Sequence, residues 1–201
     1  MERTDLPASQ GGTMAVSRPQ LAWVVLLSGA VFLCAHLPAF TNPFVINDDV
    51  RQQIYWMQQW LDPGLFRDDL LTDYARYYVP WGVKAIYWLA SWVIGPLAFS
   101  KILPGLLFVF LGLCLFQIGA KLGDRILAWT TLGIYWLTPF FLDNLAGGLA
   151  RGFAAPLLAL LLLAWLDRRP WLMALALLLQ AFFIPYIFLV GAAAVTLAWL
   201  W

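Results

Sequence analysis

Residues 102–120 read ILPGLLFVFLGLCLFQIGA, a run of apolar side chains without a single charge. A helix that crosses the hydrocarbon core of a bilayer needs about 20 such residues, so this run can span a membrane. Residues 21–40 form a second uncharged run. Further apolar runs follow at 126–141, 153–166, 171–183 and 186–201. The pattern predicts an all-α, polytopic transmembrane helix bundle of about six spans.

The composition excludes a soluble globular domain. Hydrophobic residues make up 63% of the chain and charged residues 11%, whereas soluble domains are about 45–50% apolar. A chain of 201 residues has too large a surface for its volume to hide that excess from water. The net charge of +1 predicts no nucleic-acid partner, and the lipid bilayer is the expected surrounding.

No cofactor or metal site is evident in the sequence. The single histidine, His36, has no cysteine or carboxylate near it at ligand spacing, and no glycine-rich nucleotide-binding loop occurs. Cys34 and Cys114 both lie in apolar runs and are expected to pack as small hydrophobic side chains. A requirement for a divalent metal stays open.

The polar residues 1–20 predict a disordered tail, and residues 21–201 predict one transmembrane domain. Residues 21–40 are too long for the core of a signal peptide, so we expect a retained anchor. The chain stops at Trp201 inside an apolar run, which predicts truncation at the C-terminus.

Residues 81–99 are ambiguous, because Gly95-Pro96 leaves an aromatic-rich stretch too short to span. With a cytoplasmic N-terminus, the positive-inside rule favours a surface location for this stretch. Residues 41–101 then form a first extracytoplasmic loop, on the same face as residues 142–152 and the turn at Pro185. The basic residues placed inside are Arg3, Arg18, Lys121, Arg125, Arg168 and Arg169. We expect a multi-pass protein of the plasma (bacterial inner) membrane.

The first outer loop is expected to carry interfacial helices. Asn47 is a good N-cap, and Val50, Ile54, Met57 and Leu61 recur at helical spacing. This pattern predicts an amphipathic helix lying on the bilayer. A second short helix is predicted from residue 68 or 69 to residue 78, before Pro80.

Asp48 and Asp49 open the first of these helices. Acids at a helix N-terminus complement the helix dipole, and that alone could explain them. They also lie where a lipid-borne substrate would present its head group. Since neighbouring helical side chains point about 100° apart, one acid would act on a substrate and the other would support it.

Short motifs in the same order resemble those of a known family. They are Asp48-Asp49, Pro80-Trp81-Gly82-Val83-Lys84, Lys101-Ile102-Leu103-Pro104 and Lys121-Leu122-Gly123-Asp124-Arg125. With the layout of residues 21–201, they are similar to the GT-C membrane glycosyltransferases, especially the branch of protein O-mannosyltransferases and lipid A aminoarabinose transferase. Asp49 stands where that branch has glutamate, and Trp81 and Gly82 alter its Pro-Pro-Leu-Gly-Lys motif.

The resemblance implies inverting transfer of a sugar from a polyprenyl-phosphate donor to an unknown acceptor on the outer membrane face. Asp48 would be the catalytic base and Asp49 would orient it. The side chains expected to bind the lipid phosphate are Lys84, Lys101 and Arg151. Asp143 is a further candidate in the second outer loop.

Each assignment has an alternative. Lys84 and Lys101 could instead reach the lipid–water interface or bind anionic head groups, and Arg151 could pair with Asp143. The chain could also be a fragment of a transporter or flippase, or a non-catalytic membrane subunit. Its charges collect at helix ends and in loops rather than at mid-membrane depth, which favours surface chemistry over transport.

Overall fold

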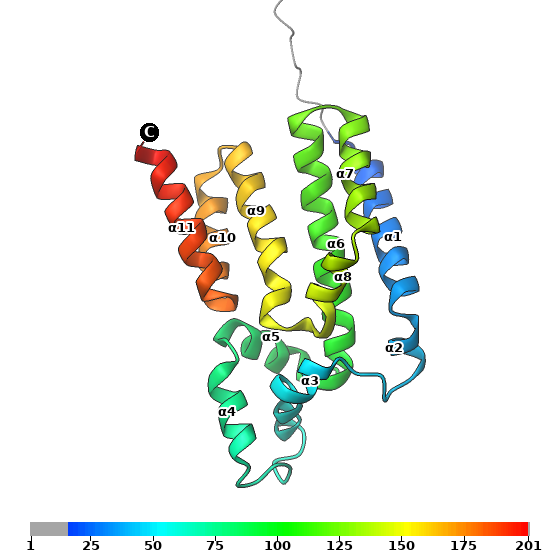
Figure 1. Ribbon diagram of the computed structural model, residues 1–201, viewed down its shortest axis with the longest axis vertical. Helices are drawn as coiled ribbons and strands as arrows, with labels where there is room; N and C mark the ends of the chain where they lie inside the picture. Colours follow the sequence, from blue (N-terminus) through cyan, green and yellow to red (C-terminus); the bar gives the residue numbers. More distant parts are fainter. Residues whose placement is uncertain (1–15, 201) are drawn as a thin grey trace, which may run out of the picture.

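The computed structural model describes residues 16–200, in which all regular secondary structure is helical, as predicted. The longer helices stand side by side as a bundle (Figure 1). They are α1 (Arg18–Ala35), α6 (Pro96–Leu122), α7 (Arg125–Leu137), α9 (Ala154–Leu166), α10 (Pro170–Phe183) and α11 (Pro185–Leu200).

Helix α6 is the centre of the bundle and packs against α1, α7 and α9. It contains the predicted run 102–120 and extends it in both directions. Glycines let its neighbours approach closely: a Cβ on Gly112 would lie 2.9 Å from Ser28 Oγ of α1, and one on Gly119 would lie 2.8 Å from Ala128 Cα of α7. Small residues at such crossings are typical of helices that pack in lipid.

Two helices, α1 with 18 residues and α6 with 27, are long and apolar enough to cross a membrane. The number of spans was predicted as about six, but the other long helices have 13 to 16 residues, fewer than the roughly 17 needed for a straight span. The predicted run 126–141 is not one helix, because it breaks at Thr138 before α8 (Pro139–Leu145). Proline at position 139 removes a backbone donor there.

Most of the predicted tail, residues 1–15, lies outside the described residues, as does Trp201. Helix α1 begins at Arg18 rather than at Leu21. A capping box starts it, in which the backbone N–H of Ser17 donates to Oε1 of Gln20 at 2.9 Å.

Several short helices gather at one end of the bundle (Figure 1). They are α2 (Leu37–Thr41), α3 (Asp48–Gln53), the 3-10 helix η1 (Tyr55–Trp60), α4 (Leu70–Tyr78) and α5 (Trp81–Ser91). Apart from α2, these elements lie within residues 41–101, where short helices were expected. The amphipathic helix predicted after Asn47 is divided at Ile54 into α3 and η1. It buries Val50, Ile54 and Met57, while Leu61 stays exposed.

The break expected at Gly95-Pro96 separates α5 from α6, since Gly95 is the N-cap of α6. Helix α5 packs against both α6 and α10. Residues 96–99, which were grouped with the surface stretch, instead form the first turn of α6.

The loops divide between the two ends of the bundle. At one end, an ion pair between Lys121 and Asp167 joins the α6–α7 turn to the α9–α10 turn. At the other end, residues 42–95 meet residues 142–153 and the break at Pro185. The structure therefore groups the segments as the charge pattern predicted.

Candidate functional site

The site is built around an ion pair between two loops that are far apart in the sequence. Nη1 of Arg151 lies 2.5 Å from Oδ2 of Asp49. Asp49 is in the first turn of α3, and Arg151 is in the 3-10 helix η3 (Ala150–Phe153). Their side chains are 32% and 41% exposed, so the pair is open to solvent and to a ligand.

The alternative prediction, that Arg151 pairs with Asp143, was wrong. Asp143 lies exposed on α8 and makes no ion pair with any residue that the structure describes. The charge of Arg151 therefore acts on α3 rather than inside its own loop.

The two acids at the start of α3 differ in their surroundings. Asn47 Oδ1 accepts the backbone N–H of Asp49 at 3.0 Å and so caps the helix, while the Asp49 carboxylate holds Arg151. The Asp48 side chain is exposed and has no hydrogen bond or ion pair within residues 16–200. One acid is thus engaged and its neighbour is free, as expected from the angle between adjacent helical positions.

A glycine turn positions Arg151 against α3. Gly147 and Gly148, in the 3-10 helix η2 (Ala146–Gly148), have φ of +82° and +62°. The buried Tyr87 hydroxyl lies 3.2 Å from both of their carbonyl oxygens and donates a hydrogen bond that the two oxygens share. A Cβ on Gly147 would lie 2.9 Å from Val50 Cγ2, so α3 rests directly on this turn.

Neither the Gly147-Gly148 turn nor Tyr87 was predicted from the sequence to belong to this site. The usable signal was the Gly-Gly dipeptide, which marks a turn with positive φ. Nothing in the sequence indicated that Tyr87, on α5, would hold that turn.

A cavity of about 500 Å³ opens beside the ion pair. It lies between the three segments predicted to share one face. Its lining includes Gln53, Tyr78, Leu149, Arg151, Pro185 and Tyr186. A guanidinium, an amide and two phenol rings around a cavity of this size suit a polar ligand with one anionic group.

Lys101 does not join this site. Its Nζ donates to the backbone carbonyl oxygens of Ala39, Asn42 and Pro43 at 2.7, 3.0 and 3.3 Å. An ammonium group has three donors, so all of them are used within the protein. We therefore assign Lys101 to the turn that follows α2.

Replacing Lys101 by methionine is expected to lower the free energy of unfolding by about 1–3 kcal/mol, because a charged donor to three carbonyls is lost. Turnover should change little. Thermal unfolding in detergent measures the first effect, and Arg125→Met, which removes an exposed cation at the other end, is the matched control. A Lys101→Met protein of unchanged stability and reduced kcat would return Lys101 to the phosphate site.

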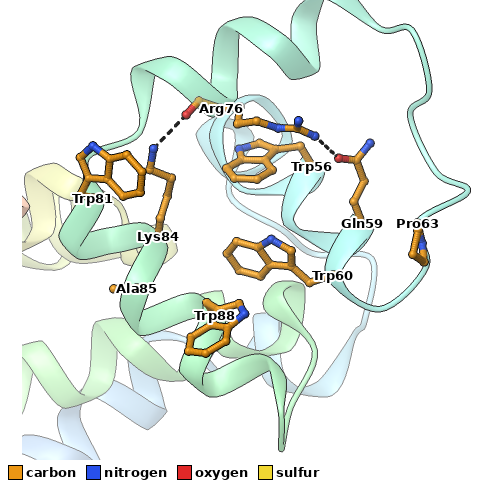
Figure 2. Close-up of a pocket in the computed structure, with 9 residues that line it drawn as sticks. All are labelled: Trp56, Gln59, Trp60, Pro63, Arg76, Trp81, Lys84, Ala85 and Trp88. Atoms are coloured by element: carbon orange, nitrogen blue, oxygen red, sulfur yellow. Dashed lines mark hydrogen bonds between the residues drawn. The ribbon is translucent and has the colours of Figure 1, made fainter.

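Lys84 lies in a different cavity, of about 750 Å³, which shares no lining residue with the first. Figure 2 shows its ammonium beside the Trp81 ring, 4.0 Å from the ring centroid, donating to the Arg76 carbonyl oxygen at 3.2 Å. Partial burial lowers the pKa of Lys84. The three cations expected together are therefore at three separate places.

Between residues 16 and 200, no three histidine, cysteine or acidic side chains come close enough to hold a metal ion. The chain matches no protein-family model, no curated protein and no solved structure. The assignment of function therefore depends on the geometry of the site and on the motifs described above.

Proposed function

We propose that the chain is the membrane domain of a GT-C-type glycosyltransferase in the plasma membrane of a bacterium. The long helices cross the bilayer, and the layer formed by α2 to α5 lies on the outer face with the N-terminus inside. The exposed apolar side chains on the outer helices support this arrangement, because water would be a poor solvent for them. Examples are Leu26 (61% exposed), Leu178 (54%) and Val190 (61%).

The reaction is inverting transfer of a sugar from a polyprenyl-phosphate donor to an acceptor hydroxyl. The Asp48 carboxylate takes the hydroxyl proton, and the acceptor oxygen forms a bond to the anomeric carbon. The bond from that carbon to the phosphate oxygen breaks, and the polyprenyl phosphate leaves with the electron pair. A positioned base of this kind typically contributes 10²–10⁴-fold in rate.

The observation that carries the proposal is the pairing of Asp49 with Arg151 at 2.5 Å next to the free Asp48. It supports the proposal because a carboxylate suited to act as the base and a cation lie where α3 meets η3. The guanidinium has five N–H donors and keeps others free to bind the phosphate as its charge builds. Lys84 and Lys101 lie outside this centre, and Asp143 has no assigned step.

Donor turnover tests the proposal. The protein in vesicles is incubated with a panel of polyprenyl-phosphate sugars, and release of free polyprenyl phosphate is followed. We expect release with at least one donor when a hydroxyl acceptor extract is present. Absence of release with every donor and extract would count against glycosyl transfer.

The orientation has its own test. In a background without Cys34 and Cys114, a cysteine at Asp62 should react with an impermeant thiol reagent added to intact cells, while one at Arg125 should react only after permeabilisation. Both positions are exposed, and they lie at opposite ends of the bundle. Labelling of both cysteines in intact cells would contradict the proposed topology.

A further inference from the structure

The larger cavity carries a separate inference, and Figure 2 shows how its side chains surround it. Four tryptophans line it, from two elements: Trp56 and Trp60 from η1, and Trp81 and Trp88 from α5. Trp56 and Trp60 meet edge to face, with ring centroids 5.5 Å apart. Indole rings with one apolar face and one N–H are characteristic of the lipid–water boundary.

Two cations enter the same cavity without an acidic partner among the described residues. The Arg76 guanidinium lies 5.5 Å from the centroid of the Trp56 ring and donates to Gln59 Oε1 at 2.5 Å. The Lys84 ammonium rests on the Trp81 ring and has one recorded hydrogen bond, to the Arg76 carbonyl oxygen. Both cations therefore keep N–H donors that no group in residues 16–200 satisfies. Because both cations line this cavity, an anion bound in it would satisfy such donors.

The apolar surface that continues from Trp88, at the edge of the cavity, favours a lipid over a soluble anion. The last turn of α5 and the residues after it expose apolar side chains: Trp88 (46%), Leu89 (60%), Trp92 (72%) and Val93 (92%). Such a surface is stable when it lies at the boundary of head groups and acyl chains. A ligand that reaches the cations from this side has an anionic head and an apolar body.

We propose that this aromatic cavity binds the phosphate head group of an anionic bilayer phospholipid, separately from the site of Asp48, Asp49 and Arg151. The two cavities share no lining residue, so different side chains hold the two head groups. Arg76 and Lys84 bind the phosphate diester, and the tryptophans pack against the glycerol and the upper acyl chain. This inference rests on the proposed membrane location and not on the proposed chemistry.

The test is photolabelling in nanodiscs, which needs no turnover. Protein is reconstituted in phosphatidylcholine with a trace of photoreactive phosphatidylglycerol or, in parallel, of photoreactive phosphatidylcholine. The label in residues 56–88 is then measured by mass spectrometry. We expect the anionic probe to be preferred, and Arg76→Gln/Lys84→Gln to reduce the preference about twentyfold, because each basic group near an anionic head group contributes several-fold.

The matched control is Arg51→Gln/Arg67→Gln, which removes two exposed cations from the same end of the bundle but outside the cavity. It should retain the preference. If Arg76→Gln/Lys84→Gln does not elute as a folded protein, Lys84→Gln alone should reduce the preference about fivefold. Equal loss in the test and control pairs, or no preference in the wild type, would overturn the proposal. Displacement of the label by equimolar polyprenyl phosphate would overturn it too, and would return Lys84 to the donor site.

Discussion

Asp48→Asn should lower the rate of glycosyl transfer about 10²–10⁴-fold, because an amide cannot accept the proton of the acceptor hydroxyl. The change keeps the size of the side chain, and the cap of α3 is unaffected because Asn47 supplies it. The measurement is kcat at saturating donor, followed as release of polyprenyl phosphate. Since Asp48 is exposed and unpaired within the described chain, the fold should tolerate the substitution.

Asp73→Asn is the matched control for this experiment. Asp73 is also an exposed acid in the first turn of a short helix, α4, without a recorded partner. It complements a helix dipole in the same way, but it does not adjoin the Asp49–Arg151 pair in the chain. We expect its rate to stay within about twofold of the wild type, because the dipole interaction is worth only about 0.3–1 kcal/mol. Equal rates for Asp48→Asn and the wild type would reduce Asp48 to the same dipole role.

Gly148→Ala should lower the free energy of unfolding by about 2–5 kcal/mol. A φ of +62° costs a residue with a Cβ about 1–2 kcal/mol. The new methyl group would also lie 2.7 Å from the Tyr87 hydroxyl and 3.1 Å from Leu103 Cδ2, and overpacking of this kind adds about 1–3 kcal/mol. Unfolding in detergent, followed by circular dichroism, measures the loss.

Gly133→Ala provides the comparison, because Gly133 lies within α7 and has no atom within 4 Å of the added Cβ. It should leave stability unchanged or raise it by up to about 1 kcal/mol, the helical preference of alanine over glycine. A Gly148→Ala protein as stable as Gly133→Ala would show that the turn under Arg151 can adopt another conformation.

Local signals in the sequence predicted much of the fold. Asn47 and Asp69 cap α3 and α4 where turn-forming residues precede helical patterns. Pro170 and Pro185, where breaks were expected, each begin a helix, whereas the start of α8 at Pro139 was not predicted. The start of a helix depends on a few neighbouring residues, so the chemistry of those residues is enough to predict it.

The arrangement of the candidate site could be predicted only in part. That Asp48 and Asp49 would differ follows from helical geometry. The partners of Arg151 and Lys101 could not be predicted in this way. Each cation bonds to a segment distant in the sequence, and the sequence offers several partners that look equally suitable. Lys101 was expected at a phosphate, yet carbonyl oxygens some 60 positions earlier in the chain hold it.

The pair between Asp49 and Arg151 also has a consequence for how the protein is made. Its two halves are separated in the chain by α4 to α8, so α3 leaves the ribosome well before η3. At a synthesis rate of about 5–20 residues per second, roughly 100 intervening residues impose a delay of about 5–20 s. During that interval α3 carries both acids without their arginine, and in the proposed topology the site is completed only when the second loop has been delivered across the bilayer.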